Sequence, residues 1–218
     1  MPTTDRRRQF IPRAVACYLA QTWQEKELVV VDDGAAPMWD LVQHVPGIVY
    51  LRYPPRMNVG RKRNIACEHS AGDVIAHWDD DDWSTPDRLV VQADRLLGTK
   101  KPLSGDGSLL FWDVRTNDAS IYAGGKDYAC GSTLMYRKDF WEQNRFLGVE
   151  CGEDSNFVGR AARLGKLDVR EDSEVRPVVI ATIHHGNTSA RSPYQWPSVP
   201  KARIPNGYFE GVACKQAS

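Results

Sequence analysis

The chain has 218 residues, and 42% of them are hydrophobic. This is enough for one domain with a substantial core and too little for two independent domains. Lys plus Arg and Asp plus Glu both number 28, so the formal net charge is zero. That balance argues against a protein whose main task is to coat nucleic acid, and the hydrophobic content excludes a disordered chain.

The five cysteines, at positions 17, 67, 130, 151 and 214, are widely spaced and include no Cys-x-x-Cys pair. Their odd number and spacing argue against a disulfide scaffold and a thiolate zinc site, and favour a reducing compartment. No apolar stretch approaches the roughly 20 residues that span a bilayer, and the charged start is unlike a signal peptide. We expect a cytoplasmic protein without a transmembrane segment, with peripheral attachment to a membrane left open.

Strand and helix patterns alternate over the first hundred residues. We predict helices over 10–23, 60–70 and 86–98, the last capped by Thr85, and buried strands over 28–31, 48–51 and 74–78. This alternation is typical of an α/β fold with a mostly parallel central sheet. Because such sheets bind ligands beyond the carboxyl ends of their strands, we expect Asp32-Asp33 and the run Asp79 to Asp82 on one edge.

The second half of the chain is less regular. We predict strands over 109–114, 132–136 and 178–183, and a helix from Glu153 to Leu164. Prolines from residue 193 onward exclude a long regular element near the end. We therefore expect a single domain over 1–218, with a regular first half (1–100), a less regular second half (101–186) and a Pro-rich tail (187–218).

Four consecutive aspartates, Asp79 to Asp82, follow the predicted strand over 74–78. Neighbouring carboxylates repel one another, so such a run is stable only with a compensating cation. Oxygen ligands favour a hard divalent ion, Mg²⁺ or Mn²⁺, over zinc. A few protein carboxylates leave coordination positions open, which suits an ion that also binds substrate phosphates.

Five short motifs resemble, in order and spacing, those of family 2 glycosyltransferases with the GT-A fold. They are Pro2-Thr3 with Asp5-Arg6; Val31 to Gly34; Asn58-x-Gly60 with Arg63-Asn64; Trp78 to Asp82 with Pro86; and Gly131-Ser132 with Arg137 and Gly152-Glu153-Asp154. Each motif alone is weak evidence. Their common order over nearly the whole chain makes the resemblance strong.

The resemblance implies that 1–100 is a nucleotide-binding half and 101–186 an acceptor half, and it implies a role for each matching residue. It assigns nucleotide-sugar binding to Thr3, Arg6, Asp32, Asp33, Asn58, Gly60, Arg63, Asp79 and Asp80. Asp81 becomes the direct metal ligand, and His184 or His185 resembles the late histidine that completes the metal shell. Asp154 becomes the general base, and Glu153 orients or contacts the acceptor.

The implied reaction moves a sugar from a nucleotide diphosphate to an acceptor hydroxyl, with inversion at the anomeric carbon. A divalent cation stabilises the charge that forms on the departing phosphate, and a carboxylate removes the acceptor proton. A UDP-sugar is favoured, because Asp32 or Asp33 can accept the imide N–H of uracil. The acceptor is a glycan, a lipid, a small molecule or, less favoured, a hydroxymethylated base of DNA.

The start of the chain departs from the family pattern. Family members have a buried, usually central strand directly before the Pro-Thr loop, whereas here Met1 stands at the last place of that strand. A missing strand leaves unpaired backbone groups and an apolar gap. We expect another segment, or the second subunit of a homo-oligomer, to fill this space.

Two other classes of protein are weighed against this interpretation. A sugar nucleotidyltransferase should carry a glycine-rich, Lys-containing phosphate loop near its start, and Arg6-Arg7-Arg8 lacks those glycines. A non-catalytic nucleotide-sugar-binding module of the same fold would not need Asp81 and Asp154, and both are present. Neither alternative matches the chain as well as the transferase does.

Overall fold

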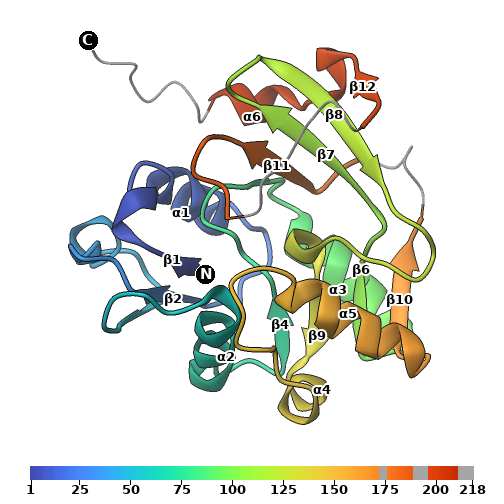
Figure 1. Cartoon of the computed structure of the whole chain (residues 1–218), viewed down its shortest axis with the longest axis horizontal. Coiled ribbons are helices and arrows are strands. Elements are labelled where there is room, and N and C mark those ends of the chain that lie inside the picture. The colour runs from blue at the N-terminus through green and yellow to red at the C-terminus, as the bar shows by residue number, and fades with distance from the viewer. Residues whose placement is uncertain (172–175, 189–195, 211–218) are drawn as a thin grey trace.

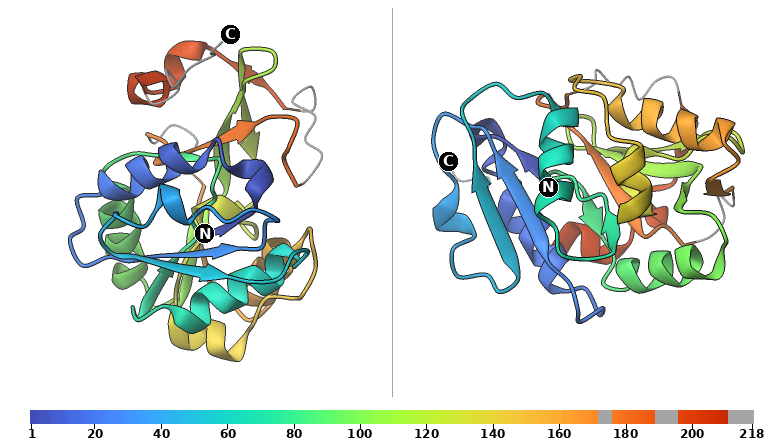
Figure 2. Two further views of the ribbon diagram at one scale, coloured as in Figure 1. Left: turned by 90° about the vertical axis from the view of Figure 1, so that its left-hand side faces the viewer. Right: turned by 90° about the horizontal axis from the view of Figure 1, so that it is seen from below.

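A computed structural model describes residues 1–171, 176–188 and 196–210. Cys214 and Pro193, both used in the sequence analysis, lie outside these ranges. The described chain is an α/β structure with three sheets. The first half of the chain faces the third sheet across the middle of the molecule (Figures 1 and 2). None of the described helices is long and apolar enough to cross a membrane.

The first sheet is parallel and consists of β1 (Pro2–Thr3), β2 (Leu28–Asp32) and β3 (Ile48–Arg52), in that order. Leu28 and Val30 of β2 pack with α1 (Ile11–Leu19). Val29 and Val31 belong to the cluster that includes Ile65 of α2 (Val59–His69). Since successive side chains of a strand point to opposite faces, β2 is buried on both sides, which explains its uninterrupted apolar sequence.

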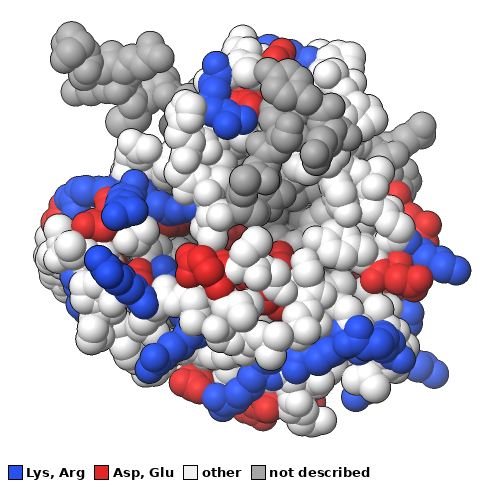
Figure 3. Space-filling model, in the orientation of Figure 1, with Lys and Arg blue, Asp and Glu red and all other residues white. Residues whose placement is uncertain are grey.

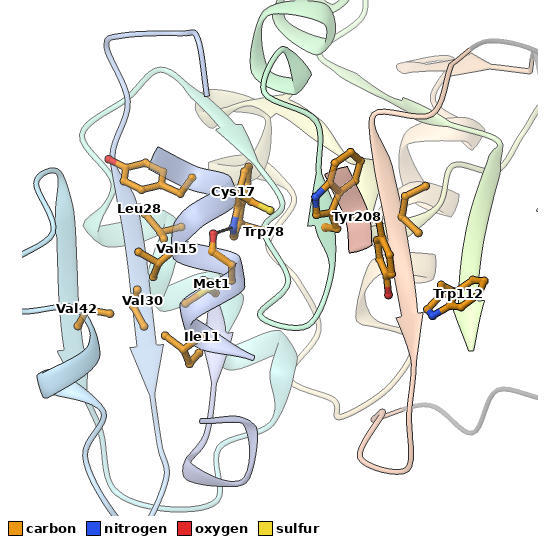
Figure 4. Close-up of a cluster of buried hydrophobic side chains, with 14 of the residues drawn as sticks. Met1, Ile11, Val15, Cys17, Leu28, Val30, Val42, Trp78, Trp112 and Tyr208 are labelled. Atoms are coloured by element: carbon orange, nitrogen blue, oxygen red, sulfur yellow. Dashed lines mark hydrogen bonds between the residues drawn. The ribbon is translucent and has the colours of Figure 1, made fainter. Parts of the chain in front are cut away.

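Met1 and β1 occupy the place where the sequence analysis expected a missing strand. The backbone N–H of Val31 donates to the Met1 carbonyl at 2.9 Å, and the Met1 amine donates to the Val29 carbonyl at 2.6 Å. The Met1 side chain is buried in the core with Ile11 and Val30 (Figure 4). A strand of two residues, β1, thus stands at this place beside β2. That a second subunit completes this sheet stays a prediction.

Two further sheets are mixed. One has the order β10 (Leu167–Arg170), β6 (Leu103–Asp106), β9 (Met135–Arg137) and β4 (Val74–Ala76). The other has the order β12 (Ser198–Val199), β8 (Asp118–Ala123), β7 (Ser108–Asp113), β11 (Val179–Ile183) and β5 (Trp83–Ser84). The remaining helices are α3 (Arg88–Gly98), α4 (Lys138–Gln143), α5 (Glu153–Arg163) and α6 (Asn206–Glu210). Parallel pairing therefore dominates only in the first sheet, because the β7–β8 hairpin and β9 introduce antiparallel neighbours.

The predicted start of α3 was wrong. The helix begins at Arg88, and Thr85 makes no capping bond: its hydroxyl has no hydrogen-bond partner among the described residues. The reason lies in the preceding residues. Trp83 and Ser84 pair with β11, and the Thr85 N–H donates to the Val178 carbonyl at 3.0 Å, so the chain still runs beside the third sheet there.

Candidate active site

A cavity of about 310 Å³ opens between the first half of the chain and the third sheet. Seven residues expected in the site line it: Thr3, Arg63, Asp79, Asp80, Asp81, Glu153 and Asp154. In the space-filling view, acidic side chains are visible near the middle of this face, while Lys and Arg lie mostly around its margin (Figure 3). The carboxyl ends of β2 and β4 meet near this cavity, as expected for ligand sites of such sheets.

Asp80 is buried beneath the cavity and held by two side chains. The Thr3 hydroxyl donates to it at 2.6 Å, and the Arg7 guanidinium donates at 3.0 Å. Burial and the neighbouring Asp81 carboxylate raise the pKa of Asp80 to about 7, despite the opposing charge of Arg7. The acidic run is thus a set of carboxylates whose mutual repulsion is only partly compensated by protein cations.

Asp81 lies where three side chains converge. It accepts hydrogen bonds from Arg7, from His184 Nε2 at 2.9 Å and from Asn187 at 3.2 Å. The His184 ring is fixed at its other nitrogen, since the Gly186 N–H donates to Nδ1 at 3.0 Å. His185, the alternative candidate, is exposed. Of the two histidines, the structure therefore brings only His184 to the acidic run.

Arg7, which the sequence analysis did not single out, is the cation at the mouth of this cluster. Besides the two aspartates, its guanidinium donates to the Gly186 carbonyl at 2.9 Å and to the Thr188 hydroxyl at 3.3 Å. Arg6, the predicted ligand, is exposed and does not line the cavity. Both residues belong to the short helix over 5–7, and of these two arginines, the first and second of the run, only the second lines the cavity.

Arg63 joins the two halves of the site. Its Nε donates to Glu153 and its terminal nitrogen donates to Asp79, both at 3.0 Å. Although burial works in the other direction, the Arg63 charge lowers the pKa of Asp79 to about 2. Burial raises the pKa of Glu153, and Arg63 opposes that shift. The guanidinium therefore fixes the acidic run relative to the start of α5.

The aspartate pair at the end of β2 plays a supporting role. Asp32 is fully buried and accepts bonds from the Gly34 N–H at 2.8 Å and from the Tyr50 hydroxyl, which hold the loop after β2. Asp33 accepts from Lys62 Nζ at 2.9 Å. Lys62 lines the cavity, whereas neither aspartate does. The sequence analysis missed Lys62, because its neighbour Arg63 carried the recognisable motif.

Asn58 and Gly60 are also absent from the cavity lining. Asn58 caps α2 by accepting the Arg61 N–H at 2.9 Å, and its amide donates to the Gly148 carbonyl at 2.9 Å. At Gly60, an added Cβ would lie 1.8 Å from the Leu147 carbonyl oxygen. These residues bind the loop before Glu153 closely against α2. Their contribution to the site is the position of that loop.

Asp154 reaches the cavity from the first turn of α5. Its Oδ1 accepts the Ser155 N–H at 2.6 Å, and among the described residues it forms no ion pair. An added Cβ at Gly131 would lie 2.0 Å from Asp154 Oδ2, so the glycine makes room for the carboxylate. His77 positions that segment by a 2.8 Å bond from its Nδ1 to the Gly131 carbonyl. The Gly-Ser motif thus shapes the surroundings of the proposed base.

The opposite wall of the cavity is aromatic. Phe111 of β7, Tyr122 of β8, Tyr128 and Trp196 line it together. The ring centroids of Phe111 and Trp196 are 4.5 Å apart, those of Tyr122 and Trp196 are 5.7 Å apart, and those of Tyr122 and Tyr128 are 5.9 Å apart. No sequence motif predicted this wall, because its members come from four separate segments.

Comparison with known proteins finds similarity in the first half of the chain. Residues 1–102 match the model of glycosyl transferase family 2. This match covers slightly less than half of the chain. A putative colanic acid biosynthesis glycosyl transferase, WcaA of Escherichia coli (strain K12), is 34% identical over 96 residues. That alignment covers 42% of this chain and 34% of WcaA, so the chain spans about a third of its curated relative.

Solved structures show that the GT-A fold extends beyond the family match. S. aureus TarS 1-349 in complex with UDP-GlcNAc superposes with a TM-score of 0.70 at 18% identity, covering 88% of this chain and 60% of TarS. The mannosyltransferase PcManGT from Pyrobaculum calidifontis, in complex with GDP-Man and Mn²⁺, gives 0.63 at 13% identity, covering 84% and 55%. These likenesses concern the fold alone.

GT-A enzymes commonly use a divalent ion, and the acidic run offers donor atoms for one. Asp81 and His184 supply the oxygen and nitrogen donors that Mn²⁺ accepts. Among the described residues, however, no group of three His, Cys, Asp or Glu side chains could hold a metal ion. Asp81 and His184 are therefore suitable ligand types for a divalent ion, and substrate oxygens would fill most of its coordination positions. Arg7 now neutralises the same carboxylate.

Proposed function

We propose that this protein is an inverting glycosyltransferase that moves a sugar from a nucleotide diphosphate to an acceptor hydroxyl. One observation carries the proposal: this cavity has paired cations and carboxylates on one side and Asp154, without an ion pair among the described residues, on the other. The first side suits a metal-bound diphosphate, and the second suits removal of a proton from an acceptor.

The favoured donor is a UDP-sugar. TarS, with which this chain shares its fold, has been solved with UDP and with UDP-GlcNAc. Asp32 or Asp33 would accept the uracil N–H. Both carboxylates are buried and hydrogen-bonded, Asp32 within its own loop and Asp33 to Lys62, which lines the cavity. Thr3, Arg63 and Asp79 lie on the same side of the cavity and would contact the ribose and the sugar.

The protein's own residues account for most steps of this mechanism. Asp154 accepts the proton of the acceptor hydroxyl, and its bond from the Ser155 N–H fixes its orientation. Arg63 holds Glu153 in place beside it. Arg7 and Arg63 place positive charge beside the departing diphosphate. Asp81, with His184, would hold Mn²⁺ or Mg²⁺, which supplies further charge stabilisation to the leaving phosphate.

The proposal is tested by incubating the protein with Mn²⁺ and a panel of UDP-, GDP- and dTDP-sugars, and measuring release of the nucleoside diphosphate. We expect release with UDP-sugars, and its loss in Asp81→Asn. Asp118→Asn is the matched control, since Asp118 is an exposed aspartate at the β7–β8 hairpin and does not line the cavity.

Unchanged release in Asp81→Asn would show that this carboxylate has no role. Isothermal titration of the same nucleotides separates enzyme from binding module. Tight binding with no turnover over a broad acceptor panel would indicate a non-catalytic module of the same fold.

A further inference from the structure

The charges that line the cavity are distributed unequally. Its three lining cations, Arg7, Lys62 and Arg63, all belong to the first half of the chain. In the second half, the charged lining residues among those described are the acids Glu150, Glu153 and Asp154. An acceptor with phosphates or carboxylates would meet like charge there, which disfavours both a duplex DNA and a lipid phosphate.

The aromatic wall offers an apolar surface beside these acids. Phe111 and Trp196 lie with tilted rings 4.5 Å apart, and Tyr122 packs edge-on against Trp196. The wall is backed by the apolar cluster of β7 and β11, which includes Leu109 and Ala181. A pocket that combines aromatic rings with a few placed polar groups selects ligands having an apolar face and a polar edge.

Tyr128 connects this wall to the proposed base. It lies close enough to Asp154 that, after burial, the carboxylate is the next largest cause raising the pKa of Tyr128 to about 12. Ser132 and Thr182 also line the cavity, and their hydroxyls are uncharged. The edge of a ligand packed on the wall would therefore meet uncharged hydroxyls and carboxylates of the protein. Asp154 lies in the same cavity.

We propose that the wall formed by Phe111, Tyr122, Tyr128 and Trp196 is the acceptor subsite for a neutral sugar ring, so that the protein extends a glycan. This inference rests on the proposed function. The C–H face of the sugar packs on the rings, and one hydroxyl points to Asp154. That hydroxyl gives its proton to Asp154 and its oxygen bonds to the anomeric carbon. The bond from that carbon to the phosphate oxygen breaks, and its electron pair leaves with the diphosphate.

The test compares acceptors and wall variants in the full-length chain. With a UDP-sugar and Mn²⁺, neutral oligosaccharides should accelerate UDP release, whereas polyprenyl phosphate and hydroxymethylated duplex DNA should not.

Trp196→Ala should raise KM for the oligosaccharide about tenfold, equivalent to about 1.4 kcal/mol. UDP affinity should be unchanged, and Trp196→Phe should recover most of the loss. Trp39→Ala is the control, because that tryptophan is 50% exposed and lies outside the cavity.

Saturation-transfer NMR with methyl glycosides gives a second measurement that needs no turnover. Transfer from the protein to the sugar's C–H protons should be reduced in Trp196→Ala. Unchanged KM and unchanged transfer in that variant would overturn the inference, as would stimulation by the lipid phosphate or the DNA alone. Absence of UDP binding and release in the unaltered protein would instead overturn the proposed function itself.

Discussion

The two sides of the cavity are built from different interactions. The side formed by residues 1–102 is a network of charges, in which Arg7, Lys62 and Arg63 each pair with an aspartate. The side formed by the second half is mostly aromatic and carries acids. Charge pairs recognise a feature common to all nucleotide diphosphates, whereas an apolar wall selects by shape. Under the proposed function, the first side would serve the nucleotide-sugar donor and the second the acceptor.

The two sides nevertheless depend on each other. Arg63 spans them, and Asn58 and Gly60 fasten the loop that leads to Glu153. A buried guanidinium between two carboxylates keeps the base and the acidic run at a fixed separation. A substitution that leaves Arg63 and this loop intact should therefore affect one side of the cavity, whereas a substitution that removes their contacts should affect both sides.

The largest effect is expected for Asp154→Asn. An amide cannot accept the acceptor proton, so kcat should fall by about 10³-fold, within the usual range for general-base catalysis. The Kd for UDP, measured by titration calorimetry, should not change, because Asp154 forms no ion pair with the first side among the described residues. A parallel loss of UDP affinity would show that the two sides are less separate than we infer.

Arg63→Met tests the connection itself. It leaves Asp79 and Glu153 without their shared partner, and Glu153 is buried. Removing one partner of a buried ion pair should cost about 3 kcal/mol in the free energy of unfolding, measured with urea. Arg95→Met is the control, since that arginine also pairs with two aspartates but lies outside the cavity. An equal loss in both variants would argue against a special role for Arg63.

Gly131→Ala should separate stability from activity. The added Cβ would lie 2.0 Å from Asp154 Oδ2, 2.9 Å from its Cγ and 3.1 Å from its Cβ, so the carboxylate must rotate away and the base of the side chain must shift slightly. The melting temperature should change little, while the displaced base should lower kcat about a hundredfold. Gly125→Ala is the matched control, because nothing lies within 4 Å of its added Cβ. Unchanged turnover in Gly131→Ala would mean that the carboxylate position is not critical.

The smallest effect concerns His77, which supports Gly131. Burial, and then Arg63, lower its pKa well below 6.5, so below that pH the unfolded chain binds a proton that the folded protein does not. Above pH 6.5 neither state binds this proton, and the free energy of unfolding is not reduced. Below pH 6.5 it decreases as the pH falls, by about 1.4 kcal/mol at one pH unit below that value. His77→Gln should reduce the difference in urea stability between about pH 7.5 and about pH 5.5. An unchanged difference would assign the pH dependence to other groups.

Sequence patterns anticipated elements that are buried on both faces or bounded by turns. The strands over 28–31 and 48–51 were found, because short apolar runs between turn signals have few other stable conformations. Strands such as Leu103–Asp106 and Leu167–Arg170 were missed. Their sequences contain glycine or charged residues and no regular alternation, and they become strands because they pair with each other in parallel and because Leu103–Asp106 also pairs with β9.

The sequence by itself determined the resemblance to family 2 glycosyltransferases and the positions of the acidic run and of the candidate base, since these depend on residue types in a fixed order. Tertiary structure decided which side chains meet in the cavity. It selected Arg7 over Arg6 and His184 over His185, and it assembled the aromatic wall from four segments. Adjacent residues differ little in sequence pattern but point in different directions, and contacts between distant segments follow from sheet pairing and burial, which short motifs do not encode.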